Sequence, residues 1–249
     1  MTVLERIGEM TESVFLAYRS AVAEGLRNVD ITKLLNLLQQ VETLQRWYKT
    51  VRILAENQFA FTDDIDEILI DSILDEKDVE NAVKEYYLLD DKKRLVSLID
   101  RCNCSIKSYN NIELFSQIVS AFEQNSYHLA CIGLFAVIDG LLSQASMKNT
   151  TGYRERFKII HDKVNSETPL SRLDKRLICL YYAFDKIDNT AFRDSRFHEE
   201  EPSNINRHWT IHGRSRRHYE LIDCIKLFQW VEAIIIMDQY DPSIAEEED

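Results

Sequence analysis

Residues 127–146 read YHLACIGLFAVIDGLLSQAS, and the middle of this segment, from Ala130 to Ile138, is apolar on every side of a helix. A helix of this kind must be surrounded by other elements that exclude water from it. The segment therefore predicts a helix at the centre of a helical bundle.

Apolar residues at helical spacing continue on both sides of this segment. Further helices are predicted over residues 4–26, 31–51, 62–73, 79–88, 95–99, 112–124, 168–188 and 216–240. Thr168 is the predicted N-cap of the helix at 168–188, with Pro169 at its first position. Only six glycines and three prolines occur in 249 residues, which is too few for the tight turns of a many-stranded sheet. The chain is therefore predicted to be all-α.

Two features bear on how these helices are organised. The narrow apolar seam of residues 31–51 fits either a hairpin with the preceding helix or contact with another chain. A polar stretch from Arg101 to Asn111 is typical of a domain boundary. We therefore predict an acidic N-terminal helical region, residues 1–105, followed by a C-terminal helical bundle, residues 106–249.

Cysteine usage and hydropathy both bear on the cellular compartment. The five cysteines are odd in number, widely spaced and mostly inside apolar runs, which is typical of reduced, buried thiols. Cys102 and Cys104 lack the spacing and the second ligand pair of a zinc site. The first residues lack a basic segment that leads into an apolar core, and no window approaches 18 consecutive apolar residues. We expect reduced cysteines, no metal at Cys102 and Cys104, and a cytoplasmic protein.

The charge is unevenly distributed along the chain. The formal net charge of −12 argues against nucleic acid as a partner, because phosphate binding draws on positive potential. Residues 148–217, however, contain 15 lysines and arginines and only 10 acidic residues. This segment either forms a local patch that meets phosphate or simply provides solvated helix faces.

The basic segment contains the run Asn206-Arg207-His208-Trp209-Thr210-Ile211-His212-Gly213, for which three interpretations compete. A metal site is one, because His208 and His212 are four residues apart. A hydrolytic zinc motif of that spacing has a glutamate after the first histidine, where this chain has Trp209, and no third ligand is evident. A structural role is the second, with Asn206 as a helix cap and apolar packing of the tryptophan and isoleucine.

Phosphodiester chemistry is the third interpretation, and it accounts for the whole cluster. An imidazole has a pKa near ~6.5 in model peptides, so it acts as a base or an acid near neutral pH. A guanidinium keeps its charge and matches phosphate oxygens with a planar fork. We expect His212 to transfer the proton and Arg207 to stabilise the transition state. Residues five apart on a helix diverge by about 140°, so the two side chains of one copy do not converge on one phosphate, which argues for a composite site.

The pattern Arg207, four residues, then His212, at the entry to the last helix of a bundle, resembles that of HEPN-domain ribonucleases. The longer form from Asn206 to Arg214, with His208 inside it, is similar to a bacterial and phage subgroup of that family. The stretch from Phe122 to Leu142 is similar to the first two bundle helices of the family, in which an acidic residue precedes a glycine, as Asp139 does here. The resemblance covers residues 112–240.

This resemblance implies a metal-independent endoribonuclease that needs no cofactor and cleaves single-stranded RNA to a 2′,3′-cyclic phosphate. It also implies a homodimer whose two motifs face each other across a cleft, a role in bacterial phage defence or as a toxin, and a regulatory or partner-binding function for residues 1–105. Asn206 and His208 would add hydrogen bonds, and Asp139 would hold an arginine or a histidine. Three further arginines are expected to hold the RNA backbone without reading its sequence: Arg214, Arg216 and Arg217.

Two rival hypotheses remain open. A non-enzymatic interaction protein would use the acidic N-terminal helices to bind a partner and the bundle only to dimerise, and the net charge of −12 favours it. A metal-dependent hydrolase built on His208 and His212 would lose its activity in a chelator.

Overall fold

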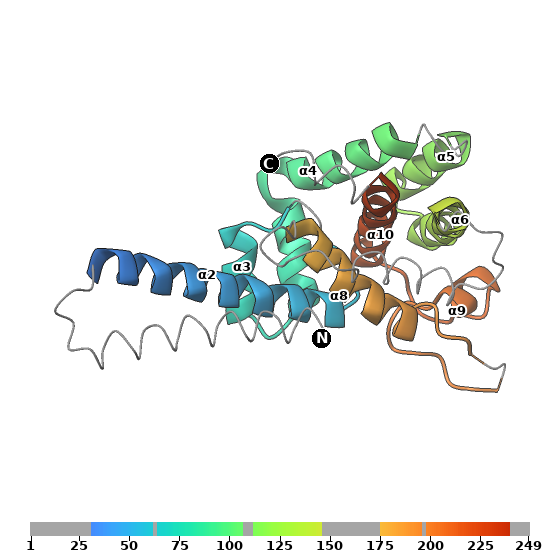
Figure 1. Ribbon diagram of the computed structural model, residues 1–249. Coiled ribbons are helices and arrows are strands. Elements are labelled where there is room, and N and C mark those ends of the chain that lie inside the picture. The colour runs from blue at the N-terminus through green and yellow to red at the C-terminus, as the bar shows by residue number, and fades with distance from the viewer. Residues whose placement is uncertain (1–30, 62–63, 107–111, 146–174, 196–197, 240–249) are drawn as a thin grey trace.

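The computed structural model describes residues 31–61, 64–106, 112–145, 175–195 and 198–239. These parts are helical and contain no strand, which confirms the all-α prediction (Figure 1). The helices are α2 (Ile31–Glu56), α3 (Glu67–Asp75), α4 (Val79–Ile106), α5 (Ile112–Glu123), α6 (Tyr127–Ala145), α8 (Lys175–Thr190), α9 (Arg207–Ile211) and α10 (Leu221–Gln239).

Helix α10 is the central element of the fold. Every residue from 222 to 235 is buried, and the helix packs mainly against α6 and α4 (Figure 1). The sequence places α6 at the centre instead, but α6 has one exposed face, on which Leu129 is 65% exposed. The apolar middle of α6 is largely buried inside the bundle, as predicted, but among the described helices α10 rather than α6 is buried on all sides.

Four polar side chains of α10 are buried at steps of three residues, and each is bound to a partner. The pairs are Asp223 with Arg217, Lys226 with Glu80, Gln229 with Tyr87, and Glu232 with Arg101. A buried polar group is costly unless it is hydrogen-bonded, so these contacts specify how the chain packs against α10. We call these four side chains the polar stripe. Because three of their partners lie on α4, the polar stripe sets the position of α4 along α10.

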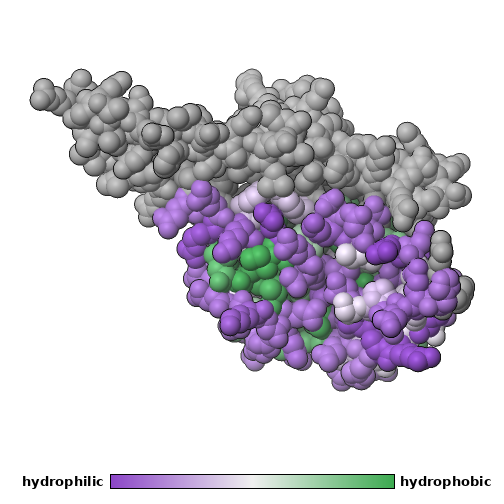
Figure 2. All heavy atoms as spheres, turned by 90° about the horizontal axis from the view of Figure 1, so that it is seen from below, coloured by the Kyte–Doolittle hydropathy of each residue, from purple (hydrophilic) through white to green (hydrophobic). Residues whose placement is uncertain are grey.

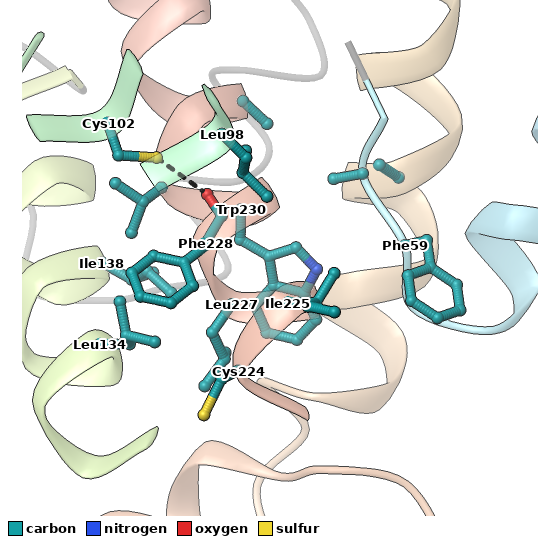
Figure 3. Packing of buried hydrophobic residues seen from close by; sticks show 14 of the residues in the cluster. Phe59, Leu98, Cys102, Leu134, Ile138, Cys224, Ile225, Leu227, Phe228 and Trp230 are labelled. Atoms are coloured by element: carbon teal, nitrogen blue, oxygen red, sulfur yellow. Dashed lines mark hydrogen bonds between the residues drawn. The ribbon is translucent and has the colours of Figure 1, made fainter. Parts of the chain in front are cut away.

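The hydrophobic core is continuous across the boundary predicted at residue 105. Figure 3 shows Leu98 and Cys102 of α4 close to Phe228 of α10, and the Cys102 thiol donates to the Phe228 carbonyl at 3.4 Å. The indole N–H of Trp230 donates to the carbonyl of Gln58 at 2.8 Å. The boundary coincides with the end of α4, but the described helices on both sides share one core. The separate functions given to the two regions stay predictions.

Several predicted helix limits differ from the observed ones. Helix α3 is capped by Asp66 rather than started by residues 62–64. The predicted pieces at 79–88 and 95–99 both lie in α4, which kinks at residues 89–92, where three residues adopt positive φ.

The last helix begins at Leu221 rather than at residue 216, because the Asp223 carboxylate accepts from the Glu220 N–H at 3.0 Å, the bond of a capping box. The predicted helix at 4–26 and the Thr168 cap lie outside the described residues.

The outer surface is mostly polar. Figure 2 shows a face that is largely hydrophilic around a smaller hydrophobic area. Within the described part of the chain, no helix is both long enough and apolar enough to cross a membrane. All five cysteines are free, as predicted, and Cys104 is the exposed one.

The Gln229→Ala variant tests the polar stripe. Gln229 donates to the Tyr87 hydroxyl at 2.9 Å and accepts from the Ala60 N–H at 3.2 Å, and both contacts are buried. Losing them leaves two polar groups without partners, so urea denaturation should show a loss of about 1–3 kcal/mol of unfolding free energy. Gln117→Ala, at an exposed site of α5, is the control and should change the unfolding free energy by less than about 0.5 kcal/mol. Equal effects of the two substitutions would contradict the role given to the stripe.

Candidate active site

Helix α9 carries the predicted motif, and Asn206 positions its start. The side-chain oxygen Oδ1 of Asn206 accepts from the Trp209 N–H at 3.2 Å, which makes Asn206 the N-cap. Its amide nitrogen donates to the carbonyls of Thr190 at 3.0 Å and Arg193 at 3.1 Å. The capping part of the structural interpretation is confirmed. Because its amide group is bonded within the chain, Asn206 acts here as a positioning residue that joins α9 to the end of α8, and its predicted contact with RNA is not visible in this geometry.

The far end of α9 is closed by a tight turn at Gly213, whose φ is +62°. The turn brings the Arg214 N–H to the Trp209 carbonyl at 2.9 Å, and the Gly213 N–H to the Thr210 carbonyl at 3.2 Å. Glycine suits this conformation because a left-handed φ is costly for residues with a Cβ. On the inner side, the hydroxyls of Thr210 and Tyr219 lie 2.7 Å apart, which ties α9 to the segment before α10.

Arg207 forms a bidentate ion pair with Asp139 of α6. Its Nε lies 2.8 and 2.9 Å from the two carboxylate oxygens, and its Nη2 lies 2.5 Å from Oδ2. The two side chains are only 17% and 21% exposed. The predicted contact between Asp139 and an arginine or histidine of the motif is thus confirmed. A planar guanidinium held by two parallel bonds has one orientation, so Asp139 determines where Arg207 presents its charge.

The rings of His208 and His212 are packed against each other. Their ring centroids lie 4.6 Å apart at an interplanar angle of 66°. Partial burial lowers the pKa of His208, and the nearby charges of His212, Arg214 and Arg207 lower it further, while Asp194 partly offsets them. The lowered pKa favours the neutral form of the His208 imidazole, which is the form that accepts a proton. His212, one residue past the end of α9, is exposed.

The three arginines predicted to bind RNA have different environments. The Arg214 guanidinium lies over the Trp209 ring, 4.1 Å from its centroid. Arg217 is bound to Asp223 at 2.9 Å and to the Ser203 carbonyl at 3.3 Å, so it stabilises the loop. The Arg216 side chain is exposed, and its backbone N–H donates to Glu201. Arg214 and Arg216 fit the prediction better than Arg217 does.

The structure thus brings Arg207, His208, His212 and Arg214 into one cluster at the junction of α6, α9 and the end of α8. Sequence reasoning missed Asp194, the acidic group near His208, because no spacing relates it to the motif. In the described segments, no group of three or more histidine, cysteine, aspartate or glutamate side chains is placed to share a metal ion. The metal interpretation of the two histidines accordingly has no third ligand in this region.

No family model matches this chain, and neither the curated proteins nor the solved structures contain a match.

The electrostatic environment of His208 is directly measurable. Because neighbouring positive charge lowers its pKa, we expect NMR titration to place that pKa below 6.5 and His212→Ala to raise it. Protonation is easier in the unfolded chain, so His208 should also reduce the unfolding free energy as the pH falls through about 6.5. The Arg216→Ala variant is the control, because it removes a charge that is not among the largest contributions to the His208 pKa. A His208 pKa at or above 6.5, or one unchanged in His212→Ala, would refute this description.

Proposed function

We propose that the protein is a metal-independent endoribonuclease of the HEPN type that cleaves single-stranded RNA. The observation that carries this proposal is the cluster in which Asp139 orients Arg207 beside the paired rings of His208 and His212. A fixed cation next to two imidazoles provides what phosphodiester cleavage needs without a metal.

The reaction begins with removal of the proton from the 2′-hydroxyl by an imidazole. The 2′-oxygen attacks phosphorus, the bond from phosphorus to the 5′-oxygen breaks, and a second imidazole protonates that oxygen. The products are a 2′,3′-cyclic phosphate and a 5′-hydroxyl. The lowered pKa of His208 favours its neutral form, which suits the first step, and the exposed His212 would take the second. Arg207 stabilises the negative charge that grows on the phosphoryl oxygens.

A homodimer is part of the proposal, because Asp139 of the same chain already binds the Arg207 guanidinium, whereas His212 is exposed and open to a second copy. His212 follows the last residue of α9, and its ring packs against the ring of His208. The exposed face of α6 offers the contact surface: Leu129 is 65% exposed and Ala136 is also exposed, and both lie on the same side of α6 as Asp139. A second copy on this face would place its own motif next to the ion pair of the first.

A non-catalytic dimerisation module is the second candidate. The net charge of −12 favours it, and so does the pairing of Arg207 with Asp139, which offsets the charge of the arginine within the chain. Such a module would keep the same dimer face and bind a partner protein through residues 1–105. The role in bacterial phage defence, or as a toxin, belongs to the nuclease proposal and follows from the family resemblance.

An RNA cleavage assay in EDTA separates the candidates. We expect the wild-type protein to cut labelled single-stranded RNA, and Arg207→Ala and His212→Ala to lower the rate at least about 100-fold, because each removes a group needed in the transition state. Arg52→Ala, an exposed arginine of α2, is the matched control and should retain the wild-type rate. Mass spectrometry of the fragments should show 2′,3′-cyclic phosphate ends.

Two outcomes would reject the nuclease. Intact RNA at every protein concentration supports the dimerisation module. Cleavage that EDTA abolishes supports a metal-dependent hydrolase instead.

A further inference from the structure

A polar cavity of about 340 Å³ lies beside the catalytic cluster, between the end of α8 and the loop that leads to α9. This volume is at the lower end of what small-molecule sites in proteins enclose. Asn206, which caps α9, is part of its wall, so the cavity begins one residue before Arg207. The other lining residues are Asn189, Thr190, Arg193, Asp194, Ser195, Glu199, Glu200, Pro202, Ser203 and Asn204.

The cavity is held in place by the same bonds that position the catalytic helix. Asn206 donates to the carbonyl of Arg193 in one wall, and the Trp209 indole N–H donates to the Ser195 hydroxyl. In the opposite wall, the Ser203 carbonyl accepts from Arg217 at 3.3 Å. Both walls are therefore tied to α9 or to the turn that follows it, and the cavity has a defined position relative to Arg207.

The lining is rich in hydrogen-bond acceptors. Among the described lining residues, three have carboxylates, Asp194, Glu199 and Glu200, and one is a cation, Arg193. An ionised carboxylate accepts hydrogen bonds and does not donate them, and it repels phosphate. The occupant that fits is a neutral group with several N–H donors. A divalent cation fits less well, because no three carboxylate or imidazole groups in the described residues are arranged to share one.

We propose that this cavity binds a guanine base of the RNA, from a nucleotide adjacent to the phosphate that is cleaved. The inference rests on the proposed nuclease function. Guanine presents two neighbouring N–H donors, at N1 and N2, that match the two oxygens of one carboxylate, whereas adenine and cytosine present one amino group and uracil one ring N–H. In single-stranded RNA these edges are unpaired and open to a protein.

Asp194 is the residue that reads the base. It lines the cavity and also acts electrostatically on His208, so it is common to the base site and to the surroundings of the imidazoles. A guanine held by Asp194 would place the neighbouring phosphate beside His208 and Arg207. Recognition of the base and positioning of the reacting group would then be coupled through one side chain.

The test uses short RNA analogues that no ribonuclease of this type can cut. Pentamers with 2′-O-methyl groups at every position, UUGUU, UUAUU and UUUUU, are titrated by fluorescence anisotropy against the full-length protein. We expect UUGUU to bind roughly tenfold more tightly than the other two, as one bidentate base contact typically provides. Asp194→Asn should abolish this preference, because an amide nitrogen cannot accept. Asp75→Asn, at an exposed site of α3, is the matched control and should keep it.

Cleavage mapping on random-sequence RNA completes the test and keeps the two proposals separate. Wild-type cleavage sites should show guanine at one fixed position next to the cut, and Asp194→Asn should lose this enrichment while it still cleaves. Cleavage without any base preference, together with equal binding of the three pentamers, would overturn the guanine site and leave the nuclease intact. A guanine preference that survives in Asp194→Asn would also overturn it. Selective binding of UUGUU without cleavage of any RNA would support the site and reject the nuclease.

Discussion

The architecture depends on the burial of α10 on all sides. A helix from which water is excluded has to satisfy its own polar groups, and α10 does so through the stripe from Asp223 to Glu232. Three of those contacts hold α4, and the apolar sides of α10 hold α6. Because α6 is fixed in this way, Asp139 has a definite position at the surface, and Arg207 meets it there. The cluster of Arg207 and the two histidines therefore depends on the packing of α10, although α10 contributes none of the residues in that cluster.

One residue, Asn206, connects the two parts of the candidate site. Its side-chain oxygen caps α9, the helix that carries Arg207 and His208. Its side-chain nitrogen donates to the Arg193 carbonyl in the wall of the polar cavity. The two proposals together would reconcile the overall charge of −12 with RNA, because positively charged groups lie around His208 and the acidic groups of the cavity would face a base rather than a phosphate. The group that reacts and the group that is recognised would then lie in separate parts of the site.

Much of the fold was predictable because it is encoded locally. The positions of α2, α5 and α6 follow from apolar spacing, and the cap at Asn206 follows from its residue type just before a helix. The features that were missed depend on contacts between distant segments. The late start of α10 depends on a bond from Asp223 to the Glu220 backbone, where the residue pattern alone continues the helix back to residue 216. The polar cavity depends on how a loop of irregular composition returns to α8, for which the sequence contains no periodic signal.

The central claim is that Arg207 of one chain and His212 of another surround a single phosphodiester. The most direct test is a heterodimer of one Arg207→Ala chain and one His212→Ala chain, purified through two different affinity tags. If the sites are composite, one of the two sites in this heterodimer keeps both groups, and the dimer should regain about half of the wild-type cleavage rate although each variant alone is inactive. A heterodimer as inactive as the two parent variants would contradict the claim.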